Sequence, residues 1–345
     1  MKKQTEPKKV FEEYCPKEDR KTTYVPTGIM PIDLLTMGKG LPLGRLIHIW
    51  SLAGFGKTTI IYSVVKNLIL AGEKVLWIGI EPSKQLAEAM GLIVNGRCID
   101  GFRYLEKVSF YDELQAVTDA WLECNEIRWM VIDSLTAVSP PLEMMKEDVL
   151  DVSIGLDARI EAKYLRLYHA LVKRKDKSII FITQSRMQIN IRPGGVTKEN
   201  AAGGKATEFY SDLRIKMIGN FDVDSSTVEQ REGSYIIGKC GYLMAEKNRH
   251  AIPFVKIPVT ILFGKGVSNL QTLFEYTRWR GLVSGQGWYS CSLDGVKIEK
   301  VQGQVKVKEW IEANIDFVKD DFYKNTEEYF ESLALANGKK AKVDF

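Results

Sequence analysis

The segment Ser51–Thr59 holds the residues with the clearest capacity for chemistry, and it reads Ser-Leu-Ala-Gly-Phe-Gly-Lys-Thr-Thr. It stands between an apolar run at 46–50 and a helical pattern at 57–70, which is the setting of a phosphate-binding loop. Glycines let backbone N–H groups turn toward phosphate oxygens, and the start of the helix adds its positive dipole end. We therefore predict an ATP site that uses Ser51, Gly54, Phe55, Gly56, Lys57, Thr58 and Thr59.

Within this loop, two residues have specific expected roles and one departs from the usual pattern. Lys57 is expected to reach the β- and γ-phosphates, and the Thr58 hydroxyl to hold Mg²⁺. Ser51 is a departure, because the usual loop begins with glycine. The alternative is a Gly-rich turn between strand and helix that binds no ligand, but Gly-Lys-Thr-Thr in this setting favours the phosphate site.

An apolar strand that ends in a carboxylate supplies a second metal ligand. Trp129–Ile132 is apolar and Asp133 follows directly, so we predict that Asp133 and Thr58 hold Mg²⁺ together. Alone this pattern is weak, since Asp commonly opens the turn after a strand. Beside a phosphate-binding loop it is specific.

Two more polar residues end apolar strands and are candidates for hydrolysis. Glu81 follows 75–80 and Gln184 follows 179–183, both at the carboxyl edge of the expected sheet, where ligands bind in such folds. Glu81 suits a water-activating group, but it equally suits a glutamate that only stabilises the first turn of a helix. Gln184 suits a sensor of the γ-phosphate or a cap for a loop, and position alone does not decide.

The elements that position these residues form an α/β fold. Nearly continuous apolar strands predict a mostly parallel sheet with helices on both faces, at 46–50, 75–80, 129–132 and 178–182. Strand-like patterns predict an antiparallel extension at 208–217, 235–246 and 254–262. From residue 267 the pattern turns mixed, with helices expected at 269–281 and 306–333 and a short strand at Trp288-Tyr289, so we expect a small second domain.

Composition is that of an ordinary soluble protein and limits the partners. The chain has 345 residues, 45% apolar and 27% charged, with a formal net charge of +4. If nucleic acid is bound, the basic residues must therefore gather locally. The five cysteines show neither disulfide nor zinc spacing, and no run is long enough to span a membrane, so we expect a cytoplasmic location and no membrane partner.

The expected helix at 156–174 carries an apolar stripe and a basic stripe. The apolar stripe should face the core and comprises Leu156, Ile160, Tyr164, Leu167 and Leu171. The basic stripe comprises Arg159, Lys163, Arg166 and Lys173. Such a stripe is either a solvated face or a phosphate-binding surface. The segment 187–206 adds basic side chains beside Gly-rich backbone, which suits binding of a phosphate backbone without sequence preference.

Taken together, these segments resemble the RecA family of recombinases, including phage-encoded members. The resemblance covers about residues 25–315, with motifs in the same order. It includes the loop entry at 27–45, the segment Asp133–Ala137, the segment Phe181–Met187, the glycine pair Gly203-Gly204 with Lys205, the basic segment Lys247–Arg249, and Gly287–Tyr289. It implies a RecA-like ATPase core at 27–266, an N-terminal oligomerisation arm at 1–26 and a small C-terminal domain at 267–345.

The resemblance also implies catalytic roles. Glu81 matches the family's catalytic glutamate, and Gln184 matches the glutamine that couples the γ-phosphate to DNA binding. Lys247 and Arg249 match the basic pair that reaches across the subunit interface to a neighbour's ATP. Each ATP site would then be complete only in a helical filament of identical subunits.

A DNA-binding surface is implied in the same way. Arg159 and Arg166 match phosphate-contacting positions, and Arg186 lies in the segment that leads into the second DNA-binding loop, whose exit matches Gly203, Gly204 and Lys205. Ile154 and Ile189 match the apolar residues inserted between base triplets, although both also suit an ordinary core. The implied partners are single-stranded and double-stranded DNA, with ATP and Mg²⁺.

Three other functions remain as alternatives. A ring helicase shares this core but usually adds an N-terminal domain. A recombination mediator with weak ATPase activity would fit Ser51, but the other motif residues oppose it. A small-molecule kinase would need an acceptor site or lid, which the sequence does not indicate.

Overall fold

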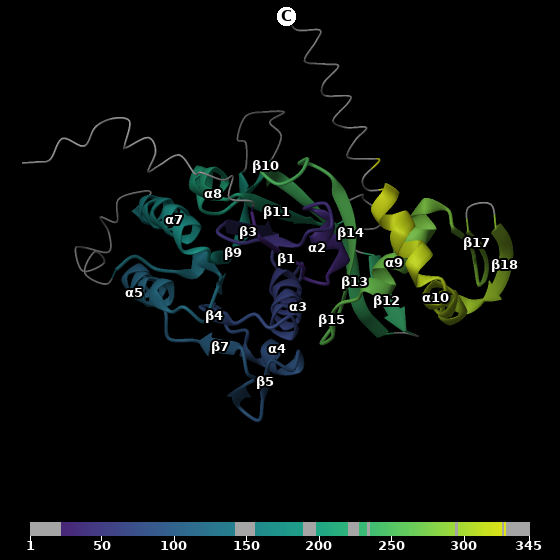
Figure 1. The fold of residues 1–345 in the computed structure, drawn as a ribbon, viewed down its shortest axis with the longest axis horizontal. Helices are drawn as coiled ribbons and strands as arrows, with labels where there is room; N and C mark the ends of the chain where they lie inside the picture. The colour runs from purple at the N-terminus through teal and green to yellow at the C-terminus, as the bar shows by residue number, and fades with distance from the viewer. Residues whose placement is uncertain are drawn as a thin grey trace, which may run out of the picture.

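A large twisted sheet forms the centre of the molecule in the computed structural model, which describes residues 22–141, 156–188, 198–219, 228–232, 235–293, 296–325 and 328 (Figure 1). Among these residues the main sheet has eleven strands in the order β15-β14-β13-β11-β3-β9-β8-β4-β7, with β10 beside β9 and β12 beside β13. The predicted α/β class with a mostly parallel central sheet is confirmed.

The parallel part carries the predicted apolar strands. It consists of β11 (Leu213–Ile218), β3 (Leu46–Ser51), β9 (Ser178–Gln188), β8 (Trp129–Asp133), β4 (Val75–Gly79) and β7 (Phe102–Leu105). The side chains of β3, β4 and β8 are buried throughout, because helices cover both faces.

The antiparallel extension begins beyond β11, one strand later than the sequence predicts, because β11 pairs parallel with β3 and antiparallel only with β13. It consists of β13 (Tyr235–Asn248), β14 (Lys256–Leu262), β15 (Gly266–Val267) and β12 (Val228–Glu232), while β10 (Lys198–Ala201) pairs antiparallel with β9. Two short hairpins lie outside this sheet, one of β1 (Tyr24–Val25) with β2 (Leu41–Pro42) and one of β5 (Ile93–Val94) with β6 (Arg97–Cys98).

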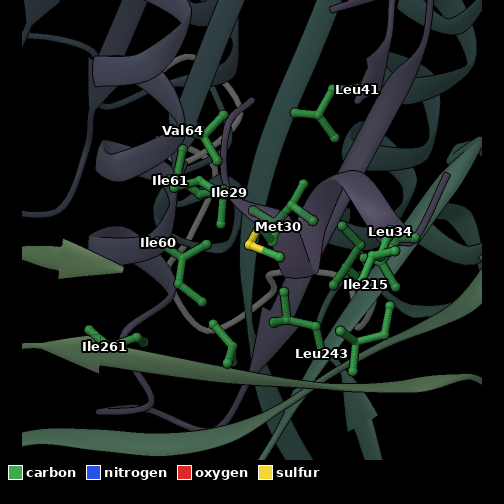
Figure 2. Packing of buried hydrophobic residues seen from close by; sticks show 14 of the residues in the cluster. Ile29, Met30, Leu34, Leu41, Ile60, Ile61, Val64, Ile215, Leu243 and Ile261 are labelled. Atoms are coloured by element: carbon green, nitrogen blue, oxygen red, sulfur yellow. The ribbon is translucent and has the colours of Figure 1, made fainter. Parts of the chain in front are cut away.

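Two hydrophobic clusters hold the helices on opposite faces of the sheet. One face is covered by α2 (Met30–Leu34), α3 (Lys57–Leu70) and α4 (Lys84–Ala89). Figure 2 shows part of this cluster, where Ile60, Ile61 and Val64 of α3 pack near Ile29 and Met30. The other face is covered by α5 (Tyr111–Glu123) and α7 (Leu156–Lys175). A short 3-10 turn, η1 (Leu135–Ala137), follows β8.

The C-terminal part adds a small antiparallel sheet with helices. It consists of α9 (Asn269–Arg280), β16 (Val283–Gln286), β17 (Trp288–Leu293), β18 (Val296–Gln302) and α10 (Gly303–Ala313), followed by a helical stretch at 315–325. The prediction of one helix over 306–333 is therefore wrong in two ways. The helix starts earlier, at Gly303, and it is interrupted at Asn314, whose φ of −117° leaves the helical region.

The predicted strand at 208–217 is also partly wrong. Residues up to Tyr210 belong to α8 (Gly204–Tyr210), and the strand begins only at Leu213. Gly203, with φ of +90°, starts α8, and the extended Ser211 ends it. At the third predicted strand, Phe254 takes a positive φ of +68°, so β14 begins two residues later than predicted.

The predicted apolar stripe of α7 is displaced. The buried side chains are Glu161, Tyr164, Leu165, Tyr168 and Val172, whereas Leu167 is 42% exposed. Two tyrosines can be buried because their hydroxyl groups have partners on α5, with Thr118 at 2.7 Å from Tyr164 and Asp119 at 2.7 Å from Tyr168.

Among the described helices, none combines the length and the hydropathy needed to cross a bilayer.

Candidate functional site

The phosphate loop connects β3 to α3, as predicted. Gly54 and Gly56 have φ values of +77° and +85°, and Gly56 directly precedes α3 without a side-chain cap. The positive dipole end of α3 is therefore directed at the loop, which favours binding of an anion there. Ser51 is not among the residues with positive φ, so the loop does not require glycine at that position.

Lys57 lies over its own loop. It is only 7% exposed, and its Nζ donates to the carbonyl oxygens of Ser51 at 3.1 Å and Leu52 at 2.9 Å. The Ser51 hydroxyl lies 3.3 Å from Nζ and donates to the Leu52 carbonyl at 2.8 Å. Carbonyl oxygens therefore hold the ammonium group at the loop, where phosphate oxygens are the stronger acceptors.

The carboxyl ends of the strands bring the predicted residues to one edge. Gly79 pairs with Asp133 between β4 and β8, and Ser51 pairs with Gln184 between β3 and β9. Thr58 is the second residue of α3, next to this edge, and it is among the groups that lower the pKa of the Asp133 carboxyl group. The four strand ends thus gather one site from segments far apart in sequence.

Asp133 has the properties of a ligand for a cation. It is 2% exposed, and its Oδ2 has no hydrogen-bond partner among the described residues. Burial raises the pKa of its carboxyl group to about 7, helped by the nearby Glu81 charge and opposed by Thr58 and Lys57. A divalent cation between Thr58 and Asp133 would use the unpaired oxygen, so these residues fit Mg²⁺.

Glu81 and Gln184 are in direct contact. The Gln184 side-chain amide donates to Glu81 Oε1 at 3.1 Å, and the Ser134 hydroxyl donates to the same oxygen. The Glu81 backbone N–H donates to the Asp133 carbonyl at 3.1 Å, which fixes the start of the segment. The site therefore contains a carboxylate held by two neutral donors, the arrangement expected of a group that orients water.

Sequence reasoning missed two residues of this site. The sequence predicts no role for Ser134, whose hydroxyl donates to Glu81. Lys239 of β13 donates to the Gly54 carbonyl at 3.5 Å and helps to line a cavity of about 220 Å³ beside the loop. Nothing in the local sequence indicates that contact, because it depends on the pairing of β13 with β14 and β11.

Lys247 and Arg249 lie away from this edge. Leu213 pairs with both Ile47 and Asn248, so the basic pair adjoins the amino-terminal end of β3. Ser51 stands four residues further along β3, which corresponds to about 13 Å of strand. Lys247 and Arg249 are therefore separated from the phosphate loop of their own chain.

Both basic side chains have partners at that end. The Lys247 Nζ donates to the carbonyl oxygens of Glu208 and Phe209, each at 2.7 Å, at the end of α8. Burial and the nearby Arg249 lower the pKa of Lys247. The Arg249 guanidinium donates to Asp212 at 2.6 Å.

The predicted DNA surface is described in part. All four basic residues of the α7 stripe, Arg159, Lys163, Arg166 and Lys173, are exposed. Lys205 is exposed at the start of α8. Arg186 belongs to β9, but its side chain lies outside the described part, as do Ile154 and Ile189 altogether.

The glycine pair Gly203-Gly204 joins this surface to the core. A Cβ atom on Gly203 would lie 2.0 Å from Glu161 Oε1 of α7 and 2.7 Å from Thr207 Cγ2. Both the lack of space for a Cβ atom and the positive φ of +90° therefore disfavour any residue other than glycine at this position. The exit of the predicted loop therefore packs directly on the helix that carries Arg159 and Arg166.

Comparison with known proteins agrees with this geometry. A family model described as the RecA N-terminal domain matches residues 8–268. The chain is 32% identical over 269 residues to Protein RecA of Xylella fastidiosa strain M12, covering 77% of this chain and 74% of the relative. It is 29% identical to Protein RecA of Mesoplasma florum, with coverage of 80% and 78%, and 28% identical to Protein RecA of Colwellia psychrerythraea, with coverage of 91% and 86%. The chain belongs to the RecA family.

Proposed function

We propose that this RecA-family protein assembles on single-stranded DNA as a helical filament, hydrolyses ATP in response to DNA, and catalyses homologous pairing and strand exchange with double-stranded DNA. The observation that carries this proposal is the separation of the ATP-site residues from the basic pair. Glu81 and Asp133 lie at one edge of the sheet, whereas Arg249 lies at the other. A repeating head-to-tail contact brings such opposite edges together.

The ATP site would work through charge neutralisation and water positioning. Lys57 and the N–H groups of the loop would bind the phosphates, and Thr58 and Asp133 would hold Mg²⁺, which would neutralise charge on the phosphate oxygens. Glu81 would orient and activate the attacking water from its position beside Ser134 and Gln184. Lys247 and Arg249 of a neighbouring subunit would stabilise the transition-state charge.

DNA binding would be coupled to ATP through β9. Gln184 contacts Glu81, and the same strand continues through Arg186 to Gln188, where the predicted second DNA-binding loop begins. A shift of Gln184 toward a γ-phosphate would therefore move the start of that loop. Such coupling makes hydrolysis depend on DNA and DNA affinity depend on ATP, because linkage is reciprocal.

The DNA contacts would come from α7, from Ile154 just before it and from the predicted second DNA-binding loop. Exposed Arg159 and Arg166 of α7 would bind phosphates, together with Arg186, Gly203, Gly204 and Lys205. Ile154 and Ile189 would insert between bases, an arrangement in which filament contacts offset the lost stacking.

The chain would be organised in three parts. Residues 1–26 would form an oligomerisation arm, 27–266 the ATPase core and 267–345 a small C-terminal domain, in a protein of the cytoplasm. A ring-helicase activity or a mediator role would use the same core. The contact between Glu81 and Gln184 and the buried Asp133 favour an active ATPase over a decayed mediator.

Steady-state ATP hydrolysis with and without single-stranded DNA tests the proposal. We expect DNA to stimulate hydrolysis, and Lys57→Ala and Glu81→Gln each to lower the stimulated rate by at least about 100-fold. Hydrolysis that does not respond to DNA would point to another RecA-core ATPase. No hydrolysis under any condition would point to the mediator.

A further inference from the structure

A buried carboxylate holds the side chain of Arg249. Asp212 lies between α8 and β11, and its side chain is 5% exposed, whereas that of Arg249 is half exposed. The Asp212 Oδ1 accepts from Arg249 Nη1 at 2.6 Å, and the Asp212 carbonyl accepts from the Arg249 backbone N–H at 3.2 Å. Asp212 thus fixes both the backbone and the guanidinium of Arg249.

The second oxygen of the same carboxylate faces α7. Asp212 Oδ2 accepts no hydrogen bond from the described residues and lies 3.5 Å from His169 Nδ1. His169 Nδ1 also lies 2.9 Å from the Tyr210 carbonyl, the last residue of α8. The carboxylate is therefore held between the end of α8, the helix α7 and the start of β11.

The difference in burial decides which partner positions the other. An exposed guanidinium is well solvated alone, but a buried carboxylate depends strongly on a cationic partner. Asp212 is anchored by its backbone N–H, which donates to the Leu46 carbonyl at 2.9 Å. The carboxylate is thus the fixed member, and the guanidinium takes its direction from it.

We propose that Asp212 is a positioning residue that orients Arg249 toward the ATP of the neighbouring subunit. This inference rests on the proposed function, in which Arg249 acts across the interface. A guanidinium has five N–H donors, and the side-chain bond to Asp212 uses one, which leaves donors for phosphate oxygens. Without the carboxylate, a flexible side chain must be ordered at each turnover, which raises the barrier.

Mixed filaments separate this role from a general effect on folding. A Glu81→Gln chain lacks hydrolysis at its own ATP but keeps Arg249, whereas an Arg249→Ala chain has the opposite defect. In a random equal mixture on single-stranded DNA, about one quarter of the sites combine both intact halves, so activity should return. This pair is the reference for the proposed trans arrangement.

Asp212→Asn should behave as Arg249→Ala does. Alone, it should lower the kcat of DNA-stimulated hydrolysis by about 10- to 100-fold while the KM for ATP changes by less than about 3-fold. Mixing with Glu81→Gln should restore activity, and mixing with Arg249→Ala should not. If Asp212→Asn fails to fold, Asp212→Glu keeps the charge but displaces the guanidinium, and it should show the same pattern.

Asp321→Asn is a matched control. Asp321 is also buried and has an arginine partner, since Arg280 Nε lies 3.8 Å from its Oδ2, but it belongs to the C-terminal part. Asp321→Asn should lower the free energy of unfolding in urea to a similar extent as Asp212→Asn does. The kcat of its DNA-stimulated hydrolysis should stay at the wild-type value.

The mixtures distinguish failure of the positioning role of Asp212 from failure of the trans arrangement. If Arg249→Ala and Glu81→Gln restore activity together, but an Asp212 variant is either fully active alone or not rescued by Glu81→Gln, the positioning role is wrong and the proposed function stands. If Arg249→Ala and Glu81→Gln restore nothing together, the trans arrangement itself is wrong.

Discussion

At the scale of single residues, the proposed ATP site combines an unpartnered carboxylate oxygen with a lysine held by backbone carbonyl oxygens. Asp133 is buried with an unpartnered oxygen, and Lys57 is held by carbonyl oxygens of its own loop. Both arrangements suit a polyanion with a bound cation, because each would exchange a weak contact for a stronger one. Binding of phosphates and a cation would therefore relieve the electrostatic cost of burying these two groups.

The first prediction concerns the stability of the metal-free protein. The pKa of Asp133 is raised from 3.8 to about 7, so the folded protein keeps this proton at pH values where the unfolded chain has lost it. The free energy of unfolding should therefore fall as pH rises from about 4 to about 7. Asp133→Asn removes this loss and should stabilise the protein near pH 8 by at most about 4 kcal/mol.

Urea denaturation in the presence of a chelator measures this effect. The stability gained by Asp133→Asn should be larger near pH 8 than near pH 5, while hydrolysis is lost in the variant. Equal differences at the two pH values would show that burial does not favour the protonated carboxyl group.

The second prediction concerns Ser134, whose hydroxyl donates to Glu81. Ser134→Ala removes one of the two donors that orient this carboxylate, so kcat should fall by about 10-fold with little change in KM. Ser134→Thr keeps the hydroxyl and should recover most of the rate. A Ser134→Ala enzyme with unchanged DNA-stimulated kcat would leave Glu81 positioned by Gln184 alone.

At the scale of elements, the direction of the parallel strands explains which site residues could be predicted from the sequence. Parallel strands place their carboxyl ends at one edge, so the positions of Asp133, Glu81 and Gln184 at the ends of apolar strands predict that all three lie beside the phosphate loop. The contacts of Ser134, Lys239 and Asp212 could not be predicted, because they depend on side-chain direction and on the register of β13.

In helix α7, the sequence pattern alone does not determine which apolar residues face the core. Its apolar residues span a wide arc, and periodicity alone selected Leu167 over Leu165 as a core residue. Packing on α5 instead buries Tyr164 and Tyr168, whose hydroxyl groups find partners there. The basic stripe is exposed, which agrees with both a solvated face and a phosphate-binding surface.

The third prediction tests the junction between α7 and α8. Gly203→Ala places a methyl group against Glu161 and Thr207, so it should cost about 1–3 kcal/mol and weaken single-stranded DNA binding. Gly204→Ala is the matched control: its φ is +61° but no atom lies within 4 Å of the added Cβ, so it should cost only about 1 kcal/mol. Equal losses of stability and of DNA affinity in the two variants, by urea denaturation and fluorescence anisotropy, would contradict the proposed close packing.

The fourth prediction concerns the basic stripe of α7. If Arg159 and Arg166 bind phosphates, each substitution by Ala should reduce the slope of log affinity against log salt by about 0.7 on single-stranded DNA. Lys66→Ala, an exposed lysine of α3 on the opposite face of the sheet, should leave the slope unchanged. A slope that is the same in all three variants would place the DNA elsewhere.

At the scale of the whole molecule, opposite ends of the strands of one sheet carry the two groups of residues that we propose to act in one reaction. The phosphate loop, Asp133 and Glu81 lie at the carboxyl edge, and Lys247 and Arg249 lie at the other end of the same strands. In the proposed arrangement each ATP site needs Lys247 and Arg249 of a neighbour, and a head-to-tail filament would complete every site but the terminal ones. DNA would organise the filament and so control hydrolysis.

Strand exchange is the measurement that tests the central claim most directly. A filament formed with ATP on single-stranded DNA is mixed with a duplex whose two strands carry a fluorescence donor and acceptor. We predict strand separation with a homologous duplex, none with a heterologous duplex, and none for Lys57→Ala. DNA-stimulated hydrolysis without homology-dependent exchange would contradict the account and identify an ATPase that moves on DNA or assists another recombinase.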